Sequence, residues 1–166
     1  MARILVAYAS KKGSTAEIAQ SIGKELQAAG HVVDVQEMRT GPSPAGYNAV
    51  IIGGPIYMGK MIGDVGKFVS RHYNELMNLP VAGFIVGLAP VSKDPPLIMN
   101  AEKVLLASLA PLQPVVITAF AGRLDPKNLS WFQNWITKKV KSPVGDFRDW
   151  TAIAAWAKEL PVRLKV

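Results

Sequence analysis

The sequence contains no cysteine, and this absence excludes several kinds of site at once. Without thiols the chain can form no disulfide, no thiolate-ligated zinc or iron–sulfur site, and no cysteine nucleophile. Histidine is nearly absent too: His31 follows the end of one expected helix and His72 lies on another, and we expect both to be structural. No metal site is expected.

Acidic residues are also scarce. The 166-residue chain has 12 Asp and Glu against 19 Lys and Arg, a formal net charge of +7. Such an excess favours anionic partners, namely phosphates, nucleic acid, an anionic membrane surface or an acidic substrate. The excess is uneven, because residues 1–83 carry 8 bases and 6 acids whereas residues 84–166 carry 11 and 6.

The composition and the N-terminus limit the class of protein. Hydrophobic residues make up 49% and charged residues 19%, which excludes a disordered or fibrous chain. The length suits one domain spanning residues 1–166. Met1, Ala2 and Arg3 run directly into a strand-like stretch, so we expect no signal peptide and a cytoplasmic location.

Residues 104–122 form the one stretch that must be tested as a membrane span, since its nineteen positions carry no charge. Pro111 and Pro114 interrupt it, and its halves differ: the first has a helical pattern and the second is β-branched. We therefore interpret it as the end of a helix that begins near Pro96, a turn and a buried strand. A transmembrane span is the alternative.

Strand-like and helical patterns alternate along the chain. Several of the expected strands are continuous apolar runs, as is typical of a parallel sheet covered on both faces. The expected strands are Ile4–Ala9, Val32–Gln36, Ala49–Gly53, Val81–Gly87 and Val115–Phe120. Apolar stripes predict helices between them, formed by Ile18, Ile22 and Leu26 before Gly30, and by Val65, Phe68, Val69 and Leu76.

Two further segments of the chain complete the pattern. Residues 37–48 are rich in proline and glycine, so any helix there is vestigial. A last helix is expected from an N-cap at Asp149 to Leu160, before Pro161. This alternation predicts an α/β fold with a doubly wound parallel sheet and right-handed crossovers.

The turn after the first expected strand is a candidate phosphate-binding loop. Ligands of such sheets bind beyond the carboxyl ends of the strands. The loop consists of Ser10, Lys11, Lys12, Gly13, Ser14 and Thr15. It matches neither a Walker A loop nor G-x-G-x-x-G. Its hydroxyls, its backbone N–H groups and the helix dipole could all face a phosphate.

A simpler interpretation of the same loop stays open. Residues 14–17 fit the S-x-x-E capping box, in which Ser14 and Glu17 only close the start of the helix. A response-regulator receiver domain is excluded, because no acidic residue follows the first strand.

The loop also resembles the phosphate loop of the flavodoxin family, Thr/Ser-x-Thr-Gly-x-Thr. Ser10, Gly13 and Thr15 match the first, fourth and last positions, and Lys12 replaces the usual third hydroxyl. The resemblance implies a flavodoxin-like five-stranded parallel sheet, in the order 2-1-3-4-5, in which residues 10–15 surround the phosphate of FMN.

The segments after the third and fourth expected strands supply the other candidate residues. After the third strand, the resemblance implies that Pro55, Ile56, Tyr57, Met58 and Gly59 contact the flavin ring, with the backbone turning at Gly59. The alternative is an ordinary turn with one surface tyrosine. After the fourth strand, Leu88, Ala89 and Pro90 lie where flavodoxins usually carry an acidic, aromatic loop, which implies a more open outer face of the flavin.

Residues 122–148 are too long for an ordinary connection before the last helix, and we call them the excursion. Residues 122–141 carry five bases and one acid, and residues 129–141 look helical, with an aromatic stripe beside a lysine cluster. Such a helix fits an anionic membrane surface. Packing on its own domain and a dimer contact are the alternatives. No nucleic-acid-binding module accompanies the charge, so no nucleic acid is expected.

From end to end the chain resembles one branch of the family, the flavodoxin-like, menaquinone-dependent protoporphyrinogen oxidases and their relatives. The matching segments are residues 10–15, Ile52 to Gly59, Ala121 to Leu124, and Asp149-Trp150; Met58 departs from the branch, which commonly has a base there. The resemblance implies an FMN-dependent oxidoreductase with quinone as acceptor and a donor similar to protoporphyrinogen.

Two consequences follow for partners. The propionates of such a donor would meet Arg123, Lys127 or Lys138, a hypothesis based on local charge alone. The alternative function is a non-catalytic electron carrier between redox proteins. Carriers of the family are typically acidic, so the net charge of +7 favours a flavoprotein that meets an anionic substrate or membrane.

Overall fold

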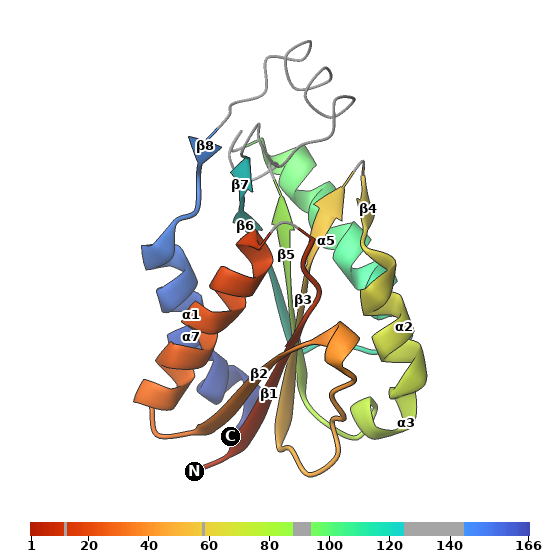
Figure 1. The fold of residues 1–166 in the computed structure, drawn as a ribbon, viewed down its shortest axis with the longest axis vertical. Coiled ribbons are helices and arrows are strands. Elements are labelled where there is room, and N and C mark those ends of the chain that lie inside the picture. Colours follow the sequence, from red (N-terminus) through yellow and green to blue (C-terminus); the bar gives the residue numbers. More distant parts are fainter. Residues whose placement is uncertain (12, 58, 88–93, 125–144) are drawn as a thin grey trace.

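The molecule is built on five parallel strands (Figure 1). This computed structural model describes residues 1–11, 13–57, 59–87, 94–124 and 145–166. The parallel strands are β1 (Arg3–Tyr8), β2 (Val32–Glu37), β3 (Ala49–Tyr57), β5 (Val81–Gly87) and β6 (Val116–Ala121). Their order, β2-β1-β3-β5-β6, confirms the predicted doubly wound arrangement.

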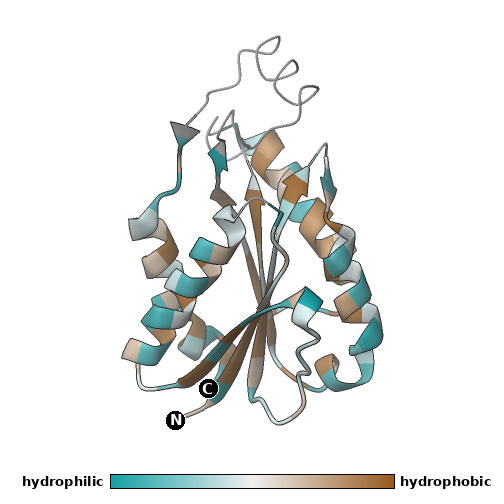
Figure 2. Ribbon diagram, viewed as in Figure 1, coloured by the Kyte–Doolittle hydropathy of each residue, from teal (hydrophilic) through white to brown (hydrophobic). Residues whose placement is uncertain are grey.

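Helices cover both faces of the sheet (Figure 1). One face carries α1 (Ser14–Ala28) and α7 (Trp150–Leu164); the other carries α2 (Gly63–Arg71), α3 (Tyr73–Leu76) and α5 (Pro95–Leu109). Each face has its own buried apolar cluster. Because both faces are covered, the strands are apolar along most of their length, as the hydropathy colours show (Figure 2).

The long uncharged run has the predicted division. Helix α5 ends at Leu109 and β6 begins at Val116, so residues 104–122 supply the end of a helix, a turn and a strand. In the part of the chain that the structure describes, no helix is both long and apolar enough to cross a bilayer. The vestigial helix expected between β2 and β3 is a single 3₁₀ turn, η1 (Met38–Thr40).

Helix α7 ends later than the sequence predicted. Its start agrees with the prediction, since the Asp149 carboxylate accepts the Ala152 N–H at 3.0 Å. Its end does not, because the helix continues through Pro161 to Leu164. Leu160 and Leu164 are one turn apart and both buried, and this packing holds the last turn in place although proline removes a backbone donor.

Strand β3 also ends later than predicted: it was expected to end at Gly53, and it continues through Gly54 to Tyr57. Packing requires glycine at both positions: a Cβ on Gly53 would lie 2.0 Å from Cζ of Phe84, and a Cβ on Gly54 would lie 2.9 Å from side-chain atoms of Met61 and Val65. The buried phenyl ring of Phe84 occupies the space that a side chain at position 53 would need.

We expect Gly53→Ala to destabilise the protein by roughly 1–3 kcal/mol, because Phe84 or the strand must shift to admit the methyl group. Urea unfolding followed by circular dichroism measures the change. Gly66→Ala is the matched control: a Cβ there meets nothing within 4 Å, and alanine favours the interior of α2. Equal stability of the two variants would contradict the packing role of Gly53.

Candidate functional site

The carboxyl ends of the parallel strands meet at one edge of the sheet, where ligands of such folds bind. After β6, the Gly122 N–H donates to the Gly87 carbonyl at the end of β5, at 2.9 Å. The Arg123 N–H donates to the Ser14 hydroxyl oxygen at 3.3 Å. The residues that directly follow β6 therefore contact both the end of β5 and the start of α1, which lies directly after the loop that follows β1.

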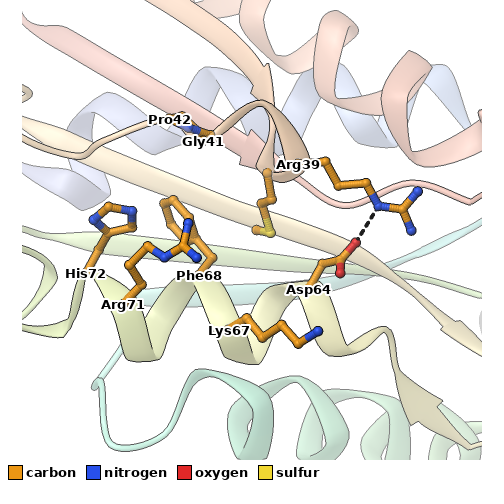
Figure 3. A pocket seen from close by; sticks show the side chains of 9 residues that line it. Arg39, Gly41, Pro42, Asp64, Lys67, Phe68, Arg71 and His72 are labelled. Carbon is orange, nitrogen blue, oxygen red and sulfur yellow. Dashed lines mark hydrogen bonds and ion pairs between the residues drawn. The ribbon is translucent and has the colours of Figure 1, made fainter.

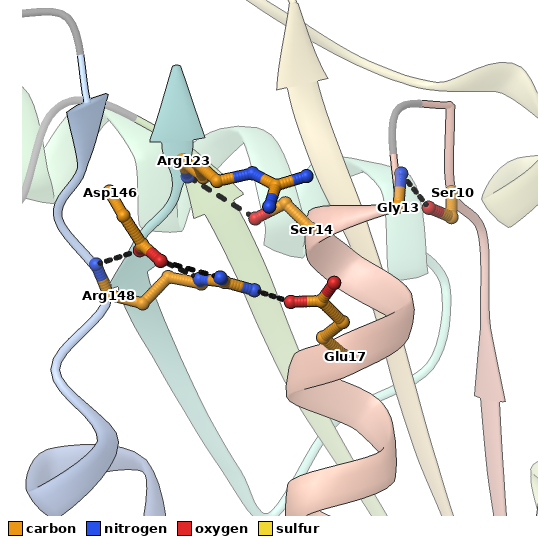
Figure 4. A network of polar contacts seen from close by, with 7 residues as sticks. All are labelled: Ser10, Gly13, Ser14, Glu17, Arg123, Asp146 and Arg148. Carbon is orange, nitrogen blue, oxygen red and sulfur yellow. Dashed lines mark hydrogen bonds and ion pairs between the residues drawn. The ribbon is translucent and has the colours of Figure 1, made fainter. Parts of the chain in front are cut away.

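The loop of residues 10–15 is held by its own serine. The Ser10 hydroxyl oxygen accepts the Gly13 N–H at 3.1 Å (Figure 4). Gly13 has φ 86°, a left-handed conformation that glycine adopts without strain, and it is the residue at which the chain enters α1. The capping-box alternative is wrong: Ser14 lies inside the helix, and no side chain caps this end.

The start of α1 offers donors that fit a phosphate group. The N–H groups of Ser14, Thr15 and Ala16 have no acceptor within the helix, and the helix dipole places partial positive charge there. The hydroxyls of Ser10, Ser14 and Thr15 lie in the same short stretch, and Thr15 is 2% exposed. These N–H and hydroxyl donors, which are neutral, together with the charge of the neighbouring Lys11, suit the phosphate of FMN.

Lys11 connects this loop to the end of β3. Its ammonium nitrogen lies 5.3 Å from the ring centroid of Tyr57, within the range of a cation–π contact. Tyr57 is half-buried, and that burial raises the pKa of its phenol. The structure thus places two of the sequence-predicted segments, residues 10–15 and the end of β3, side by side.

The end of β3 is a strand and not the predicted loop. Pro55, Ile56 and Tyr57 continue the strand, because Pro55 pairs with Val86 of β5 and Tyr57 pairs with Lys60 of the short antiparallel strand β4 (Lys60–Met61). The chain reverses before β4, and Gly59 has φ 76°, which agrees with the predicted turn.

The two neighbours at the end of β3 have different surroundings. Successive side chains of a strand alternate between its faces. Ile56 packs with the core cluster under α2 and α5, and its Cγ2 lies 2.4 Å from the position that a Cβ on Gly87 would take. Tyr57 instead lies beside Lys11. Contact of both Ile56 and Tyr57 with a flavin ring remains a prediction.

Several predicted residues lie outside the described part of the chain. Among the candidate cofactor contacts these are Lys12, Met58, Leu88, Ala89 and Pro90. Lys127, Lys138 and the expected helix of residues 129–141 also lie outside it.

Arg148 is a central residue that sequence reasoning missed (Figure 4). Its guanidinium binds the Asp146 carboxylate through two nitrogens, at 2.8 and 2.6 Å, and also pairs with the Glu17 carboxylate of α1. The same guanidinium lies 4.7 Å from the ring centroid of Trp150. The Arg148 side chain is only 5% exposed, so it joins the C-terminal end of the excursion to the first turn of α1.

The two described ends of the excursion are paired with each other. β7 (Arg123–Leu124) and β8 (Gly145–Asp146) form an antiparallel pair, and the Phe147 N–H donates to the Gly122 carbonyl at 3.2 Å. The two described ends of the excursion therefore lie side by side, close to the start of α1. Glu17 and Arg148 are 131 positions apart, so no sequence spacing signals this contact.

The Arg148 guanidinium lowers the pKa of Asp146 to about 2, through hydrogen bonds and its positive charge. Because this lies below the ordinary value near 3.8, the stabilisation from the pair is present above about pH 4 and is lost as the pH falls through 2. We expect a carboxyl NMR titration of Asp146 to show this low pKa, and Arg148→Met to return it towards the ordinary value. An unchanged pKa in the variant would contradict the pairing.

Both histidines have structural contacts, as predicted. The Nδ1 atom of His31 accepts the Ala2 N–H at 3.2 Å, which ties the N-terminus to the end of α1. His72 lies where α2 ends, and its ring packs 5.0 Å from that of Phe68.

Comparison with known proteins agrees with this geometry. The model of the flavodoxin domain family matches residues 5–151, from β1 to the start of α7. The chain belongs to this family. The match includes the loop of residues 10–15, the end of β3 and the whole excursion.

The comparisons found one kind of relative by sequence and others by structure. Protoporphyrinogen IX dehydrogenase [quinone] of Escherichia coli K12 is 26% identical over 172 residues, which cover 95% of this chain and 94% of that protein. The flavodoxin of Fusobacterium nucleatum, solved bound to flavin mononucleotide, aligns with a TM-score of 0.61 at 12% identity, over 99% of each chain. Rubredoxin oxygen:oxidoreductase of Desulfovibrio gigas aligns with a TM-score of 0.57 at 14% identity, and this chain spans 36% of its length.

Proposed function

We propose that this protein is an FMN-dependent oxidoreductase that takes electrons from a protoporphyrinogen-like donor and passes them to a quinone. The observation that carries the proposal is the similarity to the E. coli quinone-dependent dehydrogenase, which extends over 95% of the chain and is not confined to one motif. The site geometry supports it independently, because the donor set at the start of α1 fits the phosphate of FMN.

In this proposal the chain holds FMN by its phosphate at residues 10–15. Ser10 holds the loop through Gly13, so the free N–H groups of α1 and the hydroxyls of Ser14 and Thr15 are left for the phosphate. Lys11 supplies a positive charge beside the loop while it rests on Tyr57. Bound FMN would supply the redox chemistry, and the protein supplies binding, orientation and electrostatics.

The ring would lie beyond the carboxyl ends of β3 and β5. Tyr57 offers a half-buried aromatic face there, and the turn at Gly59 brings backbone to the same edge. We further propose that Pro55, Ile56 and Met58 from the β3 side, and Leu88, Ala89 and Pro90 from the β5 side, complete the contact with the ring.

The positive charge of the chain suits an anionic donor. Arg123 is exposed at the start of the excursion, next to Ser14, where it could meet a carboxylate of the donor. Lys127 and Lys138 remain candidates for the same role. Contact of residues 129–141 with an anionic membrane would place the protein near a lipid-soluble quinone, and this contact stays a prediction.

The visible spectrum of the purified protein is the first test, followed by release and identification of the flavin. Anaerobic addition of protoporphyrinogen should then bleach the flavin absorbance, and a menaquinone analogue should restore it. A protein that binds FMN but is not reduced by protoporphyrinogen would exclude this donor. A colourless protein that fails to bind added FMN would exclude the proposed function altogether.

A second function is favoured by the structural similarity to flavodoxins, which covers the whole chain. In that case the protein would be an electron carrier that exchanges electrons with acidic redox proteins. Stopped-flow measurements distinguish the two: a carrier is reduced rapidly by a protein partner only, whereas the enzyme turns over with the small donor and a quinone.

A further inference from the structure

A pocket of about 230 Å³ lies on the face of the sheet opposite α1, between the segment around η1 and helix α2. Its lining includes Arg39, Lys67, Arg71 and His72, and we call it the basic pocket. Arg39 is in η1, whereas Lys67 and Arg71 come from α2, so elements far apart in the sequence bring the cations together. Figure 3 shows them around the pocket.

The charges of the basic pocket are unbalanced. Its one carboxylate, that of Asp64, is held by Arg39 at 2.9 Å (Figure 3). In the described part of the chain, neither Lys67 nor Arg71 takes part in an ion pair. These two cations are one helical turn apart on α2, a spacing at which like charges repel. No described carboxylate pairs with either cation to reduce that repulsion. A bound anion would reduce it.

The pocket also has an apolar wall. Phe68 lies between the two cations in the sequence of α2, is 5% exposed, and packs its ring 5.0 Å from that of His72. Pro42 lines the pocket beside η1. Apolar groups beside a pair of cations suit an organic anion better than a simple inorganic ion.

We propose that the basic pocket binds a small organic phosphate ester. A phosphate monoester carries close to two negative charges at neutral pH, which matches the two cations that have no carboxylate partner. The fork of the Arg71 guanidinium is suited to two phosphate oxygens, and Lys67 supplies a compact second charge. The organic part would lie against Phe68 and His72. This site is separate from the phosphate-binding loop, because α1 and α2 lie on opposite faces of the sheet.

The test is a titration of the FMN-saturated protein with phenyl phosphate, followed by ¹H–¹⁵N NMR at constant ionic strength. FMN occupies the phosphate-binding loop, so the titration reports other sites. We expect shifts confined to residues 38–42 and 64–72. Shifts at residues 10–17, or shifts spread over the exposed lysines, would overturn the proposal. If FMN does not bind, the same titration of the flavin-free protein still distinguishes the two sites, so failure of the proposed function is separate from failure of this one.

Matched variants identify the cations. Lys67→Gln and Arg71→Gln should each raise the Kd for phenyl phosphate roughly tenfold. Each substitution removes a hydrogen bond between charged groups, and such a bond is stronger than one between neutral groups. Lys24→Gln on α1 and Arg163→Gln on α7 remove the same charges from exposed positions elsewhere and should leave the Kd unchanged. Equal weakening by all four variants would mean that only the net charge of the protein matters, and would overturn the proposal.

Asp64→Asn gives a test in the opposite direction. It removes the carboxylate that occupies Arg39, so a third cation becomes available and the Kd should fall about threefold. A damaged fold cannot produce tighter binding, so this gain separates a binding role from a structural one. An unchanged or higher Kd would show that Arg39 does not face the ligand and would contradict the assigned site.

Discussion

Ser14→Ala is expected to weaken FMN binding roughly tenfold to a hundredfold and to leave riboflavin binding unchanged. The Ser14 hydroxyl oxygen accepts the Arg123 N–H at 3.3 Å. That bond uses a lone pair of the oxygen, so the hydroxyl proton stays free to be donated to the phosphate. A hydrogen bond to a charged group contributes about 1.5–3 kcal/mol, which corresponds to this range of Kd.

The comparison of the two flavins makes the test specific. Riboflavin lacks the phosphate, so a change confined to FMN identifies the phosphate as the group that Ser14 contacts. Quenching of flavin fluorescence measures both dissociation constants. Ser21→Ala, on the same helix but away from its N-terminus, is the control. Equal losses for FMN and riboflavin would mean that Ser14 acts on the fold or on the ring site.

Arg148→Met is expected to produce the second large effect, a loss of FMN affinity of about tenfold together with a loss of stability of roughly 1–2 kcal/mol. The Arg148 side chain is almost fully buried, whereas its partners Glu17 and Asp146 are about half exposed, at 51% and 44%. Solvent screens the carboxylates, so the energetic loss is smaller than that of a fully buried pair.

The effect on FMN follows from the position of Glu17 in the first turn of α1. Without the guanidinium, the Glu17 charge is no longer neutralised close to the end of α1 at which we propose that the phosphate binds. The β7–β8 pair, which contains Arg123, also loses the ion pair with α1 and is left with the hydrogen bond from the Arg123 N–H to Ser14. Both changes disfavour a bound phosphate, although Arg148 itself is placed at no ligand contact.

A second substitution separates these two causes. Glu17→Gln removes the charge and keeps a group that can accept a hydrogen bond from Arg148, so FMN affinity should be retained or improved. Arg163→Met, at an exposed position of α7, is the control for the loss of an arginine. FMN titration and urea unfolding measure both quantities. Wild-type FMN affinity in Arg148→Met would show that the excursion and the phosphate-binding loop are independent.

Local patterns predicted the layers of the fold well. The bounds of β1, β2, β5 and β6 were predicted to within about one residue. The central strands β1 and β5 are covered on both faces, and such strands are apolar along nearly their whole length. The Asp149 cap was also predictable, since capping depends on neighbouring residues only. The family resemblance added the strand order, which periodicity alone does not contain.

The errors share one cause, which is that distant contacts overrode a local signal. Proline at position 161 suggested a helix end, but burial of Leu164 against the core keeps the helix intact. The third strand was expected to end at Gly53, but it continues to Tyr57, and the Phe84 ring from β5 and the Val65 side chain from α2 fill the space beside Gly53 and Gly54. Ser14 and Glu17 suggested a capping box, but Arg123 and Arg148 are their partners.

The sequence by itself determined the alternating α/β architecture, the loop that can receive a phosphate, the exclusion of thiol chemistry and the excess of positive charge. These properties depend on composition and on patterns within short windows. Only the tertiary structure decided how the charges are used. It buried Arg148 between Glu17 and Asp146, and it brought Arg39, Lys67 and Arg71 around one pocket. Charge partners are set by crossovers of the sheet that join residues far apart in the chain, and no local pattern records them.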